Sequence, residues 1–387
     1  MQWEIEVAKN GEQTLKLNNT YIYSRYKPRE DAYRWIDAEF DFTKKKYLLI
    51  GLGLGYHVER LKMLAGDKEI YVFYFEEIEK SFFKFESLIT DISDLKIDEE
   101  WQVLIPKCWI TALNGHPLEP FLDDIKMKQL SYRNMSFLLR ENFEKNIELG
   151  DLKRYSPEKK KNAAIVSSGP SLNETIYWLK QIKQEVDIYC VGSALKILMK
   201  HDIVPKAVVI SDPKKSIYGQ IAGSKYNGVL LYLSTASHNA VLAHTGERFL
   251  LCQNGYIPAE KIARENNLQM FDTGGSVATL AFSLVESLHY ECLVLFGQDL
   301  GFKGNRTHAN ESTSGRNVIE KSYFKTVVSN SNLDIFSTPN LLSYLRWFQK
   351  KIKYSDLKVY NTALNGAKID GATLITENEL YNLVGNL

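Results

Sequence analysis

Short apolar runs recur at regular intervals through the middle of the chain. They cover residues 163–166, 188–191, 207–210, 229–233, 249–252 and 292–296, and helical patterns or polar loops separate most of them. Short strands that are apolar on both faces and alternate with helices form mostly parallel sheets that are covered on both sides. We therefore predict an α/β fold built on a Rossmann-like, mostly parallel sheet.

A second strand, glycine loop and helix sequence lies earlier in the chain. A strand that begins at Tyr47 leads into the glycine run at residues 51–55, and the next strand, residues 70–75, is followed by Glu76 and Glu77. An acid about 20 residues beyond a glycine loop is typical of a Rossmann-type nucleotide site. The same run also fits a loop for S-adenosylmethionine. Glycine can equally be needed there only to pack a helix on a strand, and we favour this interpretation, in which the loop binds no cofactor.

The length of 387 residues exceeds what one ordinary core requires and indicates more than one domain. The run SPEKKKN at residues 156–162 has the composition of a solvated linker. Residues 301–316 are polar and rich in glycine, as is typical of a mobile loop over a site, and a helix-rich tail with a strand-like run at 358–360 follows. We predict a smaller α/β domain at residues 1–155, a catalytic domain at 156–318, and a helix-rich segment at 319–387 that packs on it.

Composition narrows the class of protein. With 48 basic and 47 acidic residues the formal net charge is +1, so no overall field attracts a polyanion, and nucleic acid is not expected as a main partner. The four cysteines are scattered, which favours buried thiols in a reducing compartment over zinc sites or disulfides. The sequence shows neither a signal-peptide pattern nor an apolar stretch of membrane-spanning length. We expect a cytoplasmic protein without a membrane partner.

The strongest local chemistry is the segment SSGPSLNET at residues 167–175, directly after a predicted strand. Gly169 lets the backbone approach a ligand, and Pro170 fixes the turn. Ser171 or Asn173 can cap the following helix, so that free N–H groups would point at a bound phosphate. An ordinary strand-to-helix turn has a similar composition, and this alternative stays open.

A second glycine loop precedes another clear helix, which is expected to end near Leu288. Its residues are Thr273, Gly274, Gly275 and Ser276. Because loops at the carboxyl ends of parallel strands converge on one crevice, both glycine loops are expected to share it with the strand-end acids Asp212 and Asp299. Either acid alone could simply cap its own loop.

His308 lies shortly after Asp299, on the predicted mobile loop. Histidine titrates near neutral pH and is the commonest general base, so a loop that closes over a donor could bring His308 to an acceptor hydroxyl. An exposed loop histidine without a catalytic role is the alternative.

The ordered motifs SSGPSL, ISDP, DTGGSVA, FGQDLGF and RTHA resemble the MptE-like domain family. This family includes the motility-associated factor (Maf) flagellin glycosyltransferases and an archaeal pterin pyrophosphokinase. The resemblance covers residues 160–370, and the upstream IGLGLGYH unit resembles the amino-terminal domain of Maf proteins, which the shorter pterin kinases lack. The resemblance therefore favours Maf.

The central motifs are also similar to those of bacterial lipooligosaccharide sialyltransferases, which use CMP-sialic acid. Their Asn-Gly-Pro-Ser loop matches residues 168–171, and their strand-end aspartate matches Asp299. Two positions differ. Gly301 stands where they have a phosphate-contacting tyrosine, and Gly192 where they have a loop asparagine, so phosphate binding must rest on other groups. Their catalytic histidine also follows the aspartate, and His308 is the expected counterpart.

The resemblance implies an inverting glycosyltransferase that moves a pseudaminic- or legionaminic-type nonulosonic acid from its CMP-activated donor to Ser or Thr hydroxyls of flagellin. It implies His308 and Asp299 as catalytic residues and no required cofactor. The aromatic segments 21–35 and 344–348 are either flagellin-docking surfaces or core. The donor-binding residues would be Ser168, Gly169, Pro170, Ser171, Gly192, Ser193, Asp212, Thr273, Gly274, Gly275, Ser276 and Gln298.

Two other functions stay open. One is a 6-hydroxymethylpterin pyrophosphokinase that uses ATP and magnesium, in which Asp212 and Asp299 would hold the metal ion. The other is a non-catalytic assembly factor that binds a nucleotide without turning it over.

Overall fold

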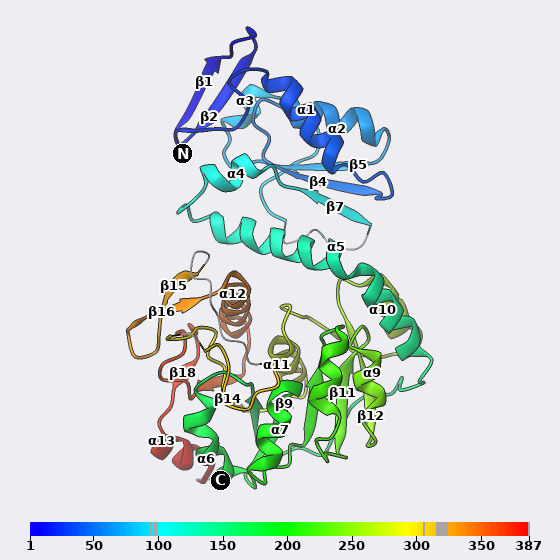
Figure 1. The fold of residues 1–387 in the computed structure, drawn as a ribbon, viewed down its shortest axis with the longest axis vertical. Coiled ribbons are helices and arrows are strands. Elements are labelled where there is room, and N and C mark those ends of the chain that lie inside the picture. Colours follow the sequence, from blue (N-terminus) through cyan, green and yellow to red (C-terminus); the bar gives the residue numbers. More distant parts are fainter. Residues whose placement is uncertain (93–94, 96, 98–99, 305, 315–323, 386–387) are drawn as a thin grey trace. The chain divides into compact units, whose positions relative to one another are not determined.

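A computed structural model of the protein describes residues 1–92, 95, 97, 100–304, 306–314 and 324–385, without the side chains of residues 126–134. The chain forms two compact units (Figure 1). Unit 1 consists of Met1–Ser131 and Gly255–Ile257, and unit 2 of Tyr132–Asn254 and Pro258–Leu387. The boundary between them falls inside a long helix, α5 (Glu119–Ile147).

Unit 1 contains a parallel sheet of four strands in the order β6-β5-β4-β7. On β4, Leu48 and Ile50 belong to one apolar cluster, whereas Tyr47 and Leu49 belong to another. Side chains alternate between the faces of a strand, so both faces of this sheet are covered. The elements are β4 (Lys46–Ile50), β5 (Glu69–Phe73), β6 (Leu88–Ile89), β7 (Trp101–Leu104), α1 (Pro28–Glu39), α2 (Tyr56–Ala65), α3 (Glu79–Phe82) and α4 (Lys107–Ala112).

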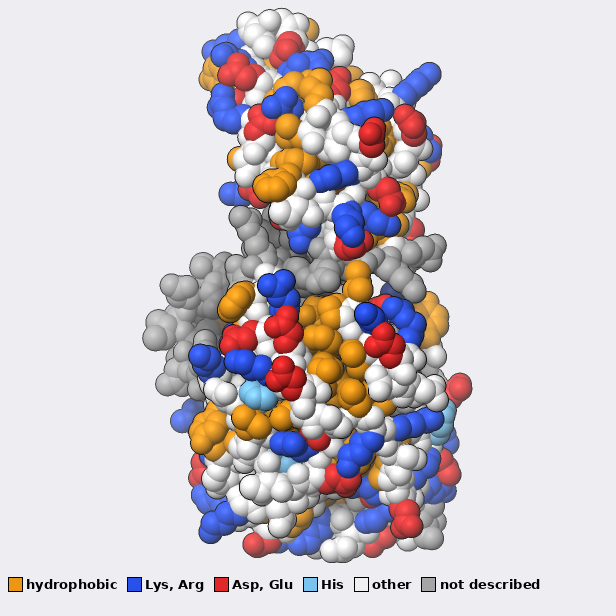
Figure 2. Space-filling model, turned by 90° about the vertical axis from the view of Figure 1, so that its right-hand side faces the viewer, with side chains coloured by type: hydrophobic (Ala, Val, Ile, Leu, Met, Phe, Trp, Pro, Cys, Tyr) orange, Lys and Arg blue, Asp and Glu red, His pale blue; other side chains and the backbone are white. Residues whose placement is uncertain are grey.

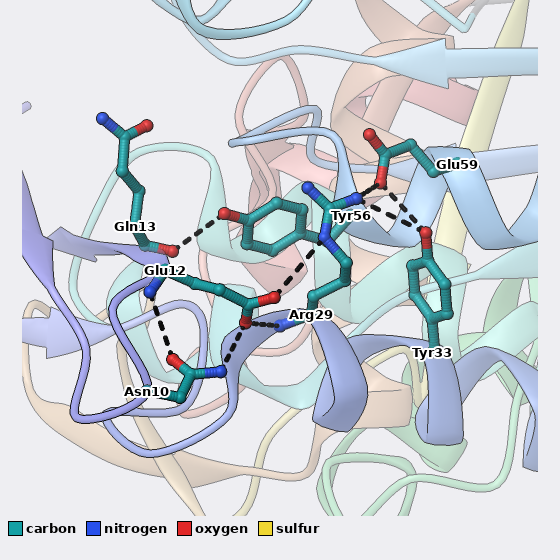
Figure 3. Close-up of polar contacts among 7 residues, drawn as sticks. All are labelled: Asn10, Glu12, Gln13, Arg29, Tyr33, Tyr56 and Glu59. Carbon is teal, nitrogen blue, oxygen red and sulfur yellow. Dashed lines mark hydrogen bonds and ion pairs between the residues drawn. The ribbon is translucent and has the colours of Figure 1, made fainter.

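A small antiparallel sheet precedes this core and consists of β1 (Trp3–Val7), β2 (Gln13–Leu17) and β3 (Thr20–Tyr21). Arg29 of α1 connects the turn between β1 and β2 of this sheet to α2 (Figure 3). The guanidinium contacts the carboxylates of Glu12 and Glu59 and lies 4.5 Å from the centre of the Tyr56 ring. The Tyr56 hydroxyl donates to the carbonyl of Gln13 at 2.9 Å. Polar contacts thus hold the hairpin on the two helices.

Unit 2 is built on a sheet of nine strands in the order β13-β12-β11-β10-β9-β8-β14-β17-β18, and every pair is parallel. Each strand that the apolar runs predict is present, and the predicted fold class is confirmed. The strands are β8 (Asn162–Val166), β9 (Val186–Val191), β10 (Ala207–Ile210), β11 (Val229–Leu233), β12 (Arg248–Gln253), β13 (Met270–Phe271), β14 (Cys292–Phe296), β17 (Lys358–Asn361) and β18 (Thr373–Leu374).

The strand order places the helices of unit 2 on two faces. From β8 to β13 the chain moves steadily toward one edge, and right-handed crossovers place the intervening helices on one face. The chain then returns to β14 beside β8, so α11 covers the opposite face, where it packs on β8, β9 and β10. The helices are α6 (Leu172–Ile182), α7 (Gly192–Lys200), α8 (Tyr218–Ile221), α9 (His238–Leu242), α10 (Ile257–Glu265) and α11 (Val277–Ser287).

The carboxyl-terminal segment contains helices α12 (Pro339–Lys353) and α13 (Glu377–Gly385) and a hairpin of β15 (Lys325–Val328) and β16 (Asp334–Ser337). It also supplies β17 and β18 of the large sheet. On α12, Phe348 is fully buried, and its ring centre lies 5.6 Å from that of Phe282 on α11. In the other aromatic segment, Tyr23 is buried whereas Tyr26 is exposed. Part of each segment is therefore core.

The mixed charges on the surface and the unpaired cysteines agree with the composition. Lys and Arg side chains are interspersed with Asp and Glu over both units on the face that Figure 2 shows. Each of the four cysteines is a free thiol. Within the described part of the chain, no helix combines the length and the apolar character that crossing a membrane requires.

Candidate functional site

A pocket of about 230 Å³ opens at the carboxyl ends of the central strands of unit 2. Strands β8 and β14 are neighbours, but the chain leaves β8 toward one edge of the sheet and β14 toward the other. Such a switch point is where open α/β sheets bind ligands. The predicted site residues that line the pocket are Ser168, Gly169, Ser193, Asp212, Ser276, Gln298, Asp299 and His308.

The Gly169 loop contacts the carboxylate of Asp299. The amide of Ser171 donates to Asp299 Oδ1 at 3.1 Å, and its hydroxyl donates to Oδ2 at 2.8 Å. A Cβ on Gly169 would overlap Oδ2 and would lie 2.5 Å from the carbonyl oxygen of Gly297. Gly169 thus does allow a close approach, but the group that approaches is the protein's own carboxylate.

The predicted side-chain cap of α6 is wrong. Ser171 occupies the N-cap position but makes no side-chain cap hydrogen bond, because its hydroxyl is engaged by Asp299. Asn173 lies inside the first turn, and its Oδ1 accepts the amide of Asn310 at 3.0 Å. Pro170 and Ser171 do not line the pocket, so the amino-terminal end of α6 meets Asp299 instead of the pocket.

Asp299 is 6% exposed, and its burial raises the pKa of the carboxyl from its ordinary range to about 7, against the opposing effect of the Ser171 hydrogen bonds. A buried carboxylate is costly in its charged form. Near neutral pH the group can therefore gain or lose a proton, which is a property of catalytic acids and bases.

The second predicted glycine loop leads into the amino terminus of α11. Its N-cap Ser276 accepts the amide of Thr279 at 3.2 Å, and the Thr279 side chain accepts the amides of Gly274 and Ser276. The amides of Val277 and Ala278 make no hydrogen bond to other described residues, and both residues line the pocket. Unsatisfied amides at the positive end of an 11-residue helix are suited to bind an anion.

The other residues of the loop before α11 determine its conformation and packing. Gly275 has a φ of +90°, which favours glycine, and a Cβ on Gly274 would meet the Trp347 ring at 2.5 Å. Thr273, Gly274 and Gly275 do not line the pocket, whereas Ser276 does. The structure therefore brings Ser276 into the site and leaves its three predecessors in the supporting turn.

Polar side chains follow the ends of β8 and β9. Ser168 and Ser193 share a hydrogen bond of 2.7 Å between their hydroxyls, and Ser167 donates to Gln298 Oε1 at 2.7 Å. Gly192 begins α7, and a Cβ there would overlap Oε1 of Gln220.

Gln220 itself lines the pocket, although no motif in the sequence indicates it. It lies on α8, a helix of four residues without a glycine loop before it. The contact with Gly192 depends on how two distant elements pack, and this is why sequence reasoning missed Gln220. Tyr344, predicted only as part of an aromatic segment, lines the pocket as well.

The segment that carries His308 lies against the Gly169 loop. The amide of Ala309 donates to the carbonyl of Ser168 at 2.8 Å, and Thr307 Oγ1 lies 2.8 Å from His308 Nδ1. Ser314 accepts a hydrogen bond from Gln220 Nε2 at 3.0 Å. Of the predicted mobile loop, residues 305, 315 and 316 lie outside the described residues. The described part thus brings His308 into the same pocket as Asp299.

Asp212 lines the pocket at the end of β10, and its Oδ1 accepts the amide of Lys214 at 2.9 Å. Asp212, Asp299 and His308 thus line the same pocket. Within the described residues, no group of three or more His, Cys, Asp or Glu side chains is arranged to hold a metal ion.

The glycine loop of unit 1 is occupied by a side chain of its own unit. The carboxylate of Glu79 is fully buried and accepts the amides of Leu52 at 3.1 Å and Gly53 at 2.9 Å. A Cβ on Gly51 would overlap the Trp109 ring, and one on Gly55 the Phe83 ring. The glycines therefore allow aromatic rings to pack on the loop.

The predicted acids beside this loop have other partners. Glu76 accepts the Trp3 indole N–H at 2.6 Å, and Glu77 accepts the Tyr74 hydroxyl at 2.7 Å. The acid that faces the loop is Glu79, whose pKa is raised by burial. The contacts of Glu76 and Glu77 thus do not support the alternative of a Rossmann-type nucleotide site at this loop.

Comparisons with known proteins show a matching family and a short match to a curated relative. Residues 138–305 match the family described as 6-hydroxymethylpterin diphosphokinase MptE-like. A curated relative, an uncharacterized protein from Treponema pallidum (strain Nichols), is 42% identical over 59 residues, which cover 14% of this chain and 20% of that protein. The chain thus spans about a fifth of the length of that relative.

A solved structure resembles nearly the whole chain. The Maf glycosyltransferase from Magnetospirillum magneticum AMB-1 aligns with a TM-score of 0.51 over 98% of this chain and 71% of that protein, at 14% sequence identity. At this identity the likeness concerns the fold. Residues 138–305 match the MptE-like family, as the motifs predict, and the chain resembles a Maf glycosyltransferase in fold.

Proposed function

We propose that the protein is a glycosyltransferase whose donor nucleotide binds in the pocket at the β8/β14 switch point. The observation that carries the proposal is the composition of this pocket. It joins the amides of Val277 and Ala278, which have no acceptor among the described residues, to two proton-transfer groups, Asp299 and His308. The likeness in fold to a Maf glycosyltransferase supports this type of reaction.

The donor is a CMP-activated nonulosonic acid of the pseudaminic or legionaminic type, as the sialyltransferase-like motifs suggest. Its phosphate would lie at the amino terminus of α11, where two amides and the helix dipole favour negative charge. As the bond between the anomeric carbon and the phosphate oxygen breaks, CMP leaves with the electron pair. The amides then stabilise the charge that develops, and stabilisation of this kind usually contributes more to the rate than any other single effect.

His308 would take the proton from a Ser or Thr hydroxyl of flagellin while that oxygen bonds to the anomeric carbon from the opposite side. Such a base contributes roughly 100- to 10,000-fold to the rate. Thr307 would orient the ring through Nδ1. Asp299 would hold the Gly169 loop through Ser171 and, with a pKa of about 7, act as a second proton-transfer group. No cofactor is needed for these steps.

The test is a binding titration of the purified chain with CMP, ATP and S-adenosylmethionine, each with and without magnesium. We expect metal-independent CMP binding that is lost in Gly169→Ala, because the new Cβ would overlap Asp299. Gly219→Ala is the matched control, because a Cβ there has open space and the backbone needs no positive φ. Failure of the folded wild type to bind CMP would refute the proposal.

Transfer of diphosphate to 6-hydroxymethylpterin is a second candidate, favoured by the description of the family that residues 138–305 match. In this reaction Asp212 and Asp299 would face a magnesium ion held by ATP. Magnesium-dependent ATP binding without a response to CMP would select it. Nucleotide binding with no donor cleavage, unchanged by His308→Ala, would instead indicate a non-catalytic assembly factor.

A further inference from the structure

The carboxyl-terminal half of α5 carries two buried asparagines, Asn142 and Asn146, in unit 2. Their exposed fractions are 6% and 0%. Residues four apart lie on the same face of a helix, so both amides face the same surroundings. A buried carboxamide is stable only when its donors and acceptor are paired.

Asn142 pairs with two loops at the carboxyl edge of the sheet. Its Nδ2 donates to the carbonyl of Pro213 at 2.9 Å and to that of Thr235 at 3.4 Å, and its Oδ1 accepts the amide of His238 at 3.2 Å. One side chain thus joins the loop after β10 to the loop after β11.

Asn146 makes further contacts with the loop after β11. Its Nδ2 donates to the carbonyls of Ser234 at 3.0 Å and Ala236 at 2.9 Å. Its Oδ1 lies 2.9 Å from His238 Nδ1, which must carry the hydrogen because the amide oxygen accepts. Together the two asparagines hold the loop at residues 234–238 through main-chain groups and the His238 ring.

These contacts hold the main chain at and beside Asp212. The amide of Ser237, inside the fixed loop, donates to the carbonyl of Asp212 at 3.0 Å. The next residue, Pro213, is held by Asn142. The main chain of Asp212 is therefore tied through its own carbonyl and through the residue that follows, while its side chain lines the pocket and accepts the amide of Lys214.

We propose that Asn142 and Asn146 are positioning residues of the nucleotide pocket and act through Asp212. The proposal rests on the proposed function insofar as Asp212 contacts the bound nucleotide. The physical reason is that an apolar residue at either position would leave buried carbonyls unpaired, and the loops would relax to regain partners.

The first test does not depend on a ligand. Amide hydrogen exchange is measured for the wild type, Asn142→Ala, Asn146→Ala and the control Glu144→Ala, an exposed position of the same helix. Relative to the amides of β14, those of Ser237 and Lys214 are expected to exchange at least about tenfold faster in both asparagine variants and at the wild-type rate in the control. Unchanged relative rates would overturn the proposal.

The second test is a double-mutant cycle on nucleotide affinity. Asn142→Ala and Asp212→Ala are each expected to weaken CMP binding by about tenfold, and the double variant should bind no more weakly than Asp212→Ala. A purely structural asparagine would lower the unfolding temperature but leave the affinity of the folded protein unchanged, and additive losses would equally overturn the proposal. If the wild type binds no CMP, the proposed function fails, and the exchange rates still decide whether the asparagines position Asp212.

Discussion

Replacing Asp299 with asparagine separates the charge of this carboxyl from its shape. Asparagine resembles the protonated acid, because its Oδ1 can accept the Ser171 amide and its Nδ2 can donate to the Ser171 hydroxyl. The variant therefore keeps the hydrogen bonds around Gly169 and removes only the ionisation of residue 299.

The magnitude follows from the pKa of Asp299, which burial raises from 3.8 to about 7. A carboxyl with a raised pKa in the folded state stabilises the fold below its unfolded pKa, and this contribution disappears as the pH rises through the folded value. Because the two pKa values differ, the free energy of unfolding of the wild type should fall by roughly 2.5 kcal/mol from pH 5 to pH 8. Asp299→Asn lacks this contribution, so its stability relative to the wild type should rise by that amount.

The assay is urea unfolding of both proteins at pH 5, 6, 7 and 8, with free energies extrapolated to water. The difference between wild type and variant should change most steeply between pH 5 and 7 and level off above. Asp356→Asn, at an exposed position of the same unit, controls for the substitution itself. A difference that is flat over this range, or one in which the wild type gains with rising pH, would show that Asp299 is an ordinary ionised carboxylate and would refute the reasoning.

Three further substitutions test other parts of the structure. Glu79→Ala should lower the free energy of unfolding by about 3 kcal/mol, because it removes the acceptor of buried loop amides, and a loss below about 0.5 kcal/mol in denaturant titration would contradict this. Phe348→Ala should cost about 3 to 5 kcal/mol by the same measurement, since a fully buried ring against Phe282 is lost; a cost near zero would mean that α12 does not pack on α11. His308→Gln should reduce donor turnover at least about 100-fold while the dissociation constant for CMP stays within about twofold, and equal losses in both would assign the residue to binding.

The central sheet could be predicted because its strands are buried on both faces and therefore appear as uninterrupted apolar runs. The two-residue strand β13 and the hairpin strands β15 and β16 give no such signal, because they are short or partly exposed. Their formation depends on pairing that a local apolar pattern does not reveal. That Asp212 and Asp299 lie at one edge of the sheet could be predicted from topology alone, since parallel strands bring their carboxyl ends to one edge, whereas topology does not place the loop residue His308.

The contacts inside the site were not predictable in the same way. A glycine loop before a helix shows that the backbone can come close to a ligand, but it does not show which acceptor comes close. For α6 that acceptor is Asp299, more than a hundred residues away, and for the unit 1 loop it is Glu79. Gln220 and Asn142 reach their partners from elements without any motif.

The number of glycine loops in the sequence therefore overstates the number of anion sites. A helix amino terminus attracts an anion only while its first amides have no acceptor, because a buried amide that is already paired gains little from a second one. In this chain buried carboxylates supply acceptors for two of the three glycine loops, whereas on the helix after the third loop the amides of Val277 and Ala278 line the pocket without an acceptor from the described residues. This distribution, rather than the motif that resembles a phosphate loop most closely, is the reason for placing the donor phosphate at the amino terminus of α11.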